Sequence, residues 1–139
     1  MSTNSAIVRI PSRADRISHA APHGLTELFA PYLADAHAER LVVAGFDHCL
    51  CLIAFAEARG DADRVNGVIP AVRKVLAPSA TRYIVMAHSH VVGNAEPSSA
   101  DIDATRHVVR FLRLANIKLL DHLIVCGDDW VSMDERALI

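Results

Sequence analysis

Two histidines and an aspartate stand at a spacing that suits a metal ion. His88 and His90 are two residues apart at the end of an apolar segment, and Asp101 follows eleven residues after His90. Side chains two apart on an extended strand point to the same side, so both imidazoles can face one point. The loop between His90 and Asp101 is long enough to return the Asp101 carboxylate to that point. Two imidazoles and one carboxylate leave a fourth tetrahedral position for water, as in catalytic zinc sites.

The chemistry of such a site needs one further group. Zinc lowers the pKa of a bound water towards about 7, and a nearby carboxylate must then take the water's proton. An ordinary structural explanation competes with this one. Ser98 precedes Asp101 by three residues, which is the pattern of a helix capping box with Asp in place of Glu. The residues alone leave both interpretations open.

The surrounding segments predict an α/β domain. The segment 83–87 is short and almost wholly apolar, as a central buried strand would be. Residues 99–115 have an apolar stripe at helical spacing. Helices are predicted at residues 25–37, 69–76 and 99–115, and strands at 39–46, 49–56, 83–87, 119–125 and 130–133, with tight turns at Asp47-His48 and at 127–129. This order favours a mixed sheet flanked by helices.

The spacing of the candidate ligands resembles the JAMM motif of MPN-domain metallopeptidases, H-x-H-x7-S-x2-D. The region is more similar still to the RadC branch, in which the loop H-N-H-P-S-G is followed by P-S-x-x-D and later by I-x-L-L-D-H. The matching stretches here are 88–93, 97–101 and 117–122, and the resemblance spans about residues 25–135. It implies an MPN/JAB fold of the cytidine-deaminase-like kind, a mixed, curved sheet flanked by helices, over residues 24–139. Residues 1–23 are then expected to form an N-terminal arm.

The resemblance also implies a role for each residue of the motif. His88, His90 and Asp101 would bind one Zn²⁺ per chain. Ser98 would stabilise the tetrahedral oxyanion, and Glu39, just before an apolar strand, would act as the general base and pass the proton to the leaving amine. The implied activity is zinc-dependent hydrolysis of a peptide or isopeptide bond. Glu57 is the rival base, but it follows the second predicted strand and fits less well.

Two departures from the family pattern bear on function. Val91-Val92 replaces the usual Pro-Ser, which keeps the ligands but affects the expected substrate choice and rate. RadC-type proteins often carry an N-terminal helix-hairpin-helix region, whereas this chain has a short arm there, so a DNA-binding role based on that region does not transfer. The alternatives are a non-catalytic MPN interaction domain and an accessory protein of DNA repair or recombination.

Composition narrows the expected partners and compartment. The formal net charge is −2 and the basic residues are scattered, so charge gives no support to a nucleic-acid partner. Three cysteines imply no disulfide framework. Residues 1–11 have no long apolar run behind a basic start, so we expect no signal peptide. The longest apolar run, residues 49–56, is about half of a membrane span. We therefore expect a cytoplasmic protein with no membrane partner. Whether it forms a homo-oligomer is left open.

The remaining reactive residues are given structural roles. Cys49 and Cys51 are expected on one face of a strand as buried core thiols rather than metal ligands. His122 is expected to be a structural hydrogen-bonding residue, His107 to be solvated, and Trp130 to pack in the core or at its rim. The four other histidines show no metal-ligand spacing: His19, His23, His37 and His48.

Overall fold

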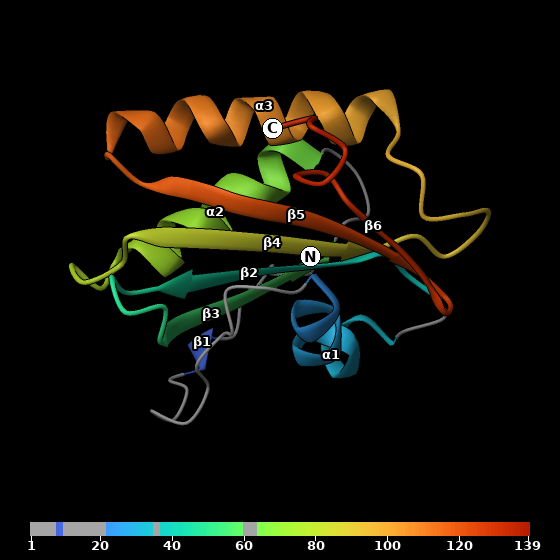
Figure 1. Cartoon of the computed structure of the whole chain (residues 1–139), viewed down its shortest axis with the longest axis horizontal. Coiled ribbons are helices and arrows are strands. Elements are labelled where there is room, and N and C mark those ends of the chain that lie inside the picture. The colour runs from blue at the N-terminus through green and yellow to red at the C-terminus, as the bar shows by residue number, and fades with distance from the viewer. Residues whose placement is uncertain (1–7, 10–21, 35–36, 60–63) are drawn as a thin grey trace, which may run out of the picture.

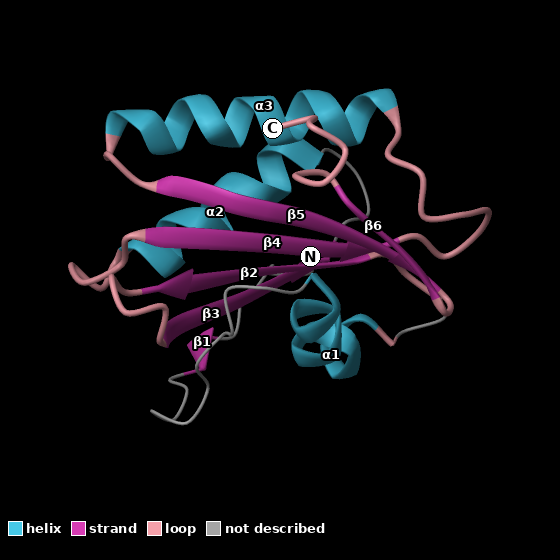
Figure 2. Ribbon diagram, in the orientation of Figure 1, coloured by secondary structure: helices cyan, strands magenta, loops and turns pink. Residues whose placement is uncertain are grey.

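The computed structural model describes residues 8–9, 22–34, 37–59 and 64–139. These residues form a six-stranded sheet with helices on both faces (Figures 1 and 2). The elements are β1 (Val8–Arg9), α1 (Pro22–Leu33), β2 (Arg40–Phe46), β3 (Leu52–Arg59), α2 (Arg64–Leu76), β4 (Tyr83–Ser89), α3 (Ser99–Leu114), β5 (Lys118–Cys126) and β6 (Asp129–Ser132). The order of strands across the sheet is β1-β3-β2-β4-β5-β6.

The sheet is mixed, as the sequence predicts. Strands β4 and β5 run parallel, and every other neighbouring pair is antiparallel. Parallel strands need a crossover connection, and here the connection contains α3. The end of β4 and the beginning of α3 are therefore joined by one loop, which is the loop of the candidate site.

Alternate residues of the central strands enter two different cores. Val43 and Met86 pack on the face covered by α2 and α3. Val42 and Val85 pack on the opposite face, which α1 covers (Figure 2). His88 lies two residues after Met86, so it projects from the face on which α3 lies.

Several predicted boundaries are corrected. The first helix begins at Pro22 and ends at Leu33, rather than spanning 25–37, and proline suits the first helical position. The second helix is longer than residues 69–76 and begins at Arg64. The third helix and the strands of the second half lie within two residues of their predicted bounds.

The predicted two-residue turn at Asp47-His48 is wrong. Strand β3 begins only at Leu52, so residues 47–51 connect it to β2. The Asp47 Oδ1 atom accepts the backbone N–H groups of Cys49 and Cys51 at 2.9 and 3.0 Å. Cys49 is exposed and Cys51 is half-buried, so the prediction of two buried core thiols on a strand is also wrong.

One strand lies within the expected N-terminal arm. β1 pairs with β3, with Val8 opposite Ala56, and the sequence did not predict it. Residues 1–7 and 10–21 lie outside the described residues. No helix among the residues that the structure describes is both long and apolar enough to cross a membrane.

Candidate metal centre

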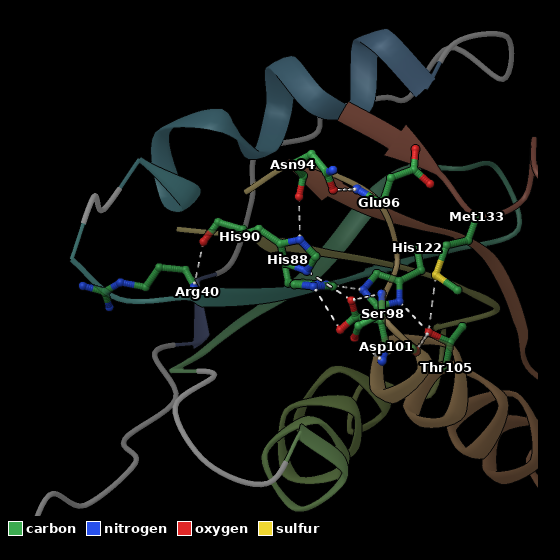
Figure 3. Close-up of polar contacts among 11 residues, drawn as sticks. Arg40, His88, His90, Asn94, Glu96, Ser98, Asp101, Thr105, His122 and Met133 are labelled. Atoms are coloured by element: carbon green, nitrogen blue, oxygen red, sulfur yellow. Dashed lines mark hydrogen bonds and ion pairs between the residues drawn. The ribbon is translucent and has the colours of Figure 1, made fainter. Parts of the chain in front are cut away.

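The three candidate ligands meet at the end of β4. His88 is the second-last residue of β4, and His90 directly follows the strand. Asp101 is in the first turn of α3. The His90 Nε2 and Asp101 Oδ2 atoms are 3.1 Å apart, and His88 Nε2 and Asp101 Oδ1 are 3.3 Å apart (Figure 3). Asp101 is 1% exposed and His88 5%. The ligand atoms all lie within 4.8 Å of one another, so this group could hold a metal ion.

The capping box is present at the same place. Ser98 is the N-cap of α3, and its Oγ accepts the Asp101 backbone N–H at 3.1 Å. In return, Asp101 Oδ2 accepts the Ser98 backbone N–H at 2.8 Å. The cap therefore holds the carboxylate beside the two rings. Helix capping and metal binding, which compete as explanations of the sequence, are compatible in the structure.

The His90 ring is fixed from its far side. Its Nδ1 lies 2.8 Å from the backbone oxygen of Asn94. A carbonyl oxygen can only accept, so Nδ1 carries the proton and donates it. In the neutral ring the lone pair is then on Nε2, which faces Asp101 (Figure 3). The His90 backbone N–H also donates to Val125, at 2.8 Å, which attaches the start of the loop to β5.

The donor set fits a divalent metal ion. A neutral His90 places a nitrogen lone pair 3.1 Å from a carboxylate oxygen, so two acceptors face each other at a buried point. Such an arrangement is stable only with a positive charge between the groups, as a proton or a cation. Imidazole nitrogens and a carboxylate oxygen are ligands that zinc binds in proteins.

Glu39 lies at the same edge of the sheet. It is half-buried and directly precedes β2, in which Leu41 pairs with His88. The next backbone N–H, of Arg40, donates to the Ser89 side chain at 2.9 Å. Continuing this register by two residues sets Glu39 opposite His90, on the face that carries the candidate ligands.

Glu57 lies on the other face of the sheet. It pairs with Val42 in the β2–β3 ladder, and Val42 belongs to the core beneath α1. Residues directly opposite in a ladder share a face, so Glu57 faces away from His88. Of the two candidate bases, only Glu39 is therefore on the face of the candidate ligands.

A second group of possible ligands occurs in the connection between β2 and β3. The group consists of Asp47, His48 and Cys49, whose ligand atoms also lie within 4.8 Å of one another. His48 and Cys49 are exposed. The group lies at the opposite end of the sheet from His88, because β2 ends beside the start of β4. The group is the weaker candidate because it is less buried than the group of His88, His90 and Asp101.

The prediction that His48 lacks the spacing of a metal ligand is wrong, because His48 belongs to the group described above. His107 is exposed on α3, as predicted, and His37 is exposed after α1. His19 and the side chain of His23 lie outside the described residues. Trp130 is half-buried on β6, in agreement with a place at the rim of the core.

His122 is closer to the site than the sequence indicates. It is buried and hydrogen-bonded, as predicted, but its Nε2 lies 2.7 Å from Nδ1 of His88. Its Nδ1 lies 2.6 Å from Oγ1 of Thr105, a residue that the sequence did not single out. A polar pair, Asp121-His122, inside an apolar strand is the signal that could have suggested a specific role.

Asp121 is a buried carboxyl group next to His122. Its oxygens accept the Ser132 hydroxyl at 2.6 Å and the His122 backbone N–H at 2.7 Å. Burial nevertheless raises the pKa of Asp121, and the hydrogen bonds only partly oppose this effect. Asp121 thus belongs to the structure around the site rather than to the ligand group.

The loop between His90 and Ser98 has an exposed first part and a buried residue, Ala95, that attaches it to the sheet. Val91 and Val92 are exposed, whereas Ala95 is buried in a small cluster with residues of β5 and β6. Beside it, Glu96 forms an exposed two-point ion pair with Arg136, at 2.6 and 2.7 Å. This guanidinium lowers the pKa of Glu96.

Comparison with known proteins assigns the family. Residues 19–138 match the family model of the RadC-like JAB domain. A UPF0758 protein of Bordetella petrii is 41% identical over 121 residues, covering 85% of this chain and 53% of the relative. A UPF0758 protein of Thioalkalivibrio sulfidiphilus is 36% identical over 131 residues, covering 92% of this chain and 56% of the relative. The chain spans about half the length of the curated relatives that it matches.

The mixed sheet, the βαβ crossover and the buried His-x-His and Asp group define a domain of the JAB/MPN class. The chain belongs to the RadC-like JAB domain family within that class.

Proposed function

We propose that this chain is a zinc-dependent metallohydrolase that cleaves a peptide or isopeptide bond. The observation that carries the proposal is the convergence of the buried His88 and Asp101 with the half-buried His90, with the carboxylate held by the helix cap. These residues would hold one zinc ion. When bound, the ion would polarise the scissile carbonyl and lower the pKa of a water molecule.

The general base in this proposal is Glu39. The β2–β4 register supports a place beside His90 on the face of the ligands. From there its carboxylate accepts the proton of the attacking water and delivers it to the leaving amine. General acid–base catalysis of this kind contributes about 10²–10⁴-fold to a rate.

Ser98 is the proposed donor to the substrate oxyanion. Its hydroxyl accepts the Asp101 backbone N–H, and a hydroxyl can accept and donate at the same time. The cap therefore agrees with a catalytic role. A donor placed at the developing negative charge stabilises the transition state by more than it stabilises the substrate.

The test combines metal analysis with amide hydrolysis. We expect about one zinc per chain in the wild type, measured by mass spectrometry after reconstitution and desalting, and a large loss in Asp101→Ala. Fluorogenic substrates with α-linked and lysine ε-linked amides measure the activity. Glu39→Gln should keep the metal and lose about 10²–10⁴-fold in kcat.

Glu57→Gln is the matched control, because it removes a carboxylate from the opposite face of the same sheet. It should keep both metal and activity. A Glu39→Gln variant as active as the wild type would remove Glu39 as the base. A zinc-loaded wild type that cleaves neither substrate class would favour the non-catalytic interaction domain, and salt-sensitive binding of labelled DNA would favour the repair-associated role.

A further inference from the structure

A chain of buried hydrogen bonds joins two of the candidate ligands behind the site. His88 Nδ1 lies 2.7 Å from His122 Nε2, and His122 Nδ1 lies 2.6 Å from Thr105 Oγ1. Thr105 Oγ1 in turn lies 2.7 Å from the backbone oxygen of Asp101 (Figure 3). His122 is 4% exposed and Thr105 0%. This series of hydrogen bonds thus connects His88 through His122 on β5 to the first turns of α3, which carry Asp101.

The direction of each hydrogen bond follows from its end point. The Asp101 carbonyl oxygen can only accept, so the single hydroxyl hydrogen of Thr105 points to it. The sulfur of Met133, 3.6 Å from the same hydroxyl, is also only an acceptor. Thr105 Oγ1 therefore accepts from His122, whose Nδ1 must carry a proton. In a neutral ring, His122 Nε2 is then an acceptor.

The last link fixes the His88 ring. With both rings neutral, His122 Nε2 accepts, so His88 Nδ1 donates and the His88 lone pair lies on Nε2. That atom faces Asp101 Oδ1 at 3.3 Å. A neutral imidazole with its lone pair towards the site is the form that binds a metal, and the hydrogen bond on the other ring nitrogen sets this form.

We propose that Thr105 and His122 are positioning residues, which fix the tautomer and orientation of His88 for metal binding through this chain of hydrogen bonds. The inference rests on the metal site of the proposed function, but it does not depend on the reaction catalysed. His90 obtains the same tautomer from a backbone carbonyl, so the two ligands are oriented by different means. Side-chain substitutions can remove the support of His88, whereas the support of His90 is part of the backbone.

A β-bulge brings His122 to the correct face. The β4–β5 register shifts between Ile84 and Val85, so that Leu120 is passed over and His122 lies opposite Met86. Met86 belongs to the core beneath α2 and α3, the side of the site. Without the shift His122 would lie opposite Ala87, which belongs to the other core. Bulges near functional sites redirect side chains in this way.

The first test reads the tautomers directly in the metal-free full chain. Long-range ¹H–¹⁵N spectra at about pH 8, above the ordinary His pKa of about 6.5, report which ring nitrogen carries the proton. We expect His88 and His122 to be protonated on Nδ1. Thr105→Val removes the hydroxyl at nearly constant volume and should mix the tautomers of both rings, while Thr105→Ser should preserve them. A wild-type His88 protonated on Nε2 would overturn the proposal.

The second test measures affinity for zinc alone by competition with a chromogenic chelator. Loss of an outer hydrogen-bond partner typically lowers metal affinity about 10–100-fold, which we expect for Thr105→Val. Thr105→Ser should stay within about threefold of the wild type. Because Thr105→Val can also fail to fold, His122→Phe provides a second variant that removes the acceptor of His88 Nδ1, with the same expected loss.

Thr81→Val is the matched control. Thr81 is another buried threonine whose hydroxyl donates to a backbone oxygen, that of Val75, at 2.9 Å. It precedes β4, so it lies at the opposite end of the sheet from His88. We expect Thr81→Val to lower stability without changing tautomers or zinc affinity. Equal affinity losses in Thr81→Val and Thr105→Val would overturn the positioning role. Failure of amide hydrolysis would leave both measurements intact, so the two proposals fail separately.

Discussion

The two ends of the central strands each carry a cluster of possible metal ligands, and the clusters differ in how the ligands are held. At one end, Asp47 uses its carboxylate to close an exposed turn. At the other end, the buried Asp101 carboxylate also caps α3, and the His90 ring is held from its far side by the backbone oxygen of Asn94. In both clusters the ligand atoms lie close together. Closeness alone therefore does not identify which cluster is the metal site. The burial of His88 and Asp101 and the hydrogen bond that orients the His90 ring distinguish the better candidate.

The largest effect that this comparison predicts is on metal binding. His90→Ala removes one of three ligands at the buried end, and we expect zinc affinity to fall at least about 100-fold. His48→Ala removes the equivalent ligand type from the turn and should leave the affinity within about twofold of the wild type. Competition with a chelator measures both variants. If the His48 variant loses the metal and the His90 variant keeps it, the assignment of the site is reversed.

A smaller effect is expected on stability at the turn. Asp47→Ala removes the acceptor for two backbone N–H groups, and we expect the free energy of unfolding to fall by about 1 kcal/mol. Zinc affinity should not change. Urea unfolding of the metal-free chain provides the measurement. Asp47→Asn keeps an oxygen acceptor and should retain most of the stability, so an equal loss in both variants would argue against the capping role of this side chain.

The smallest effect concerns Asp121, the buried carboxyl group that does not face the ligands. Burial raises its pKa, so the folded chain holds this proton more tightly than the unfolded chain. Its contribution to stability therefore falls as pH rises from the ordinary pKa of Asp through the raised one. Asp121→Asn abolishes this titration. Unfolding free energies of both chains from acidic to neutral pH should give a wild-type advantage that shrinks as pH rises, and a constant difference would contradict the raised pKa.

The ligand group could be predicted from its resemblance to the JAMM motif, and its members meet because their geometry is local. His88 and His90 need only an extended strand, and Asp101 needs only the first turn of the next helix. Both requirements follow from periodicity in the sequence. The capping pattern Ser98 to Asp101 likewise depends on neighbours in the chain, and the structure contains it.

The contact of His122 with His88 could not be predicted in the same way. It depends on the bulge in the β4–β5 ladder, which is a feature of pairing between distant strands. A regular ladder would place Asp121 opposite Met86, on the side of the site, and His122 on the other side. The alternation of side chains along one strand does not reveal the register in which that strand pairs with its neighbour. It therefore does not show which residues of the two strands share a face.

The β2–β3 connection shows a different limit. Residues 49–56 form a continuous apolar run, which favours a strand throughout. The hydrogen bonds of Asp47 and the positive φ of 62° at Leu50 instead form a turn over its first residues. A positive φ is rare for leucine, so a leucine at position 50 gives no indication of this conformation.

The 91–97 loop begins with exposed residues and is attached to the sheet by the buried Ala95, and this arrangement has an evolutionary consequence. Ala95 is packed against β5 and β6, while Val91 and Val92 contact solvent beside the rings. Changes at these two valines can therefore accumulate without altering the residues that bind or orient an ion. Evolution can in this way vary the surface next to the candidate metal centre while the geometry of its ligands stays the same.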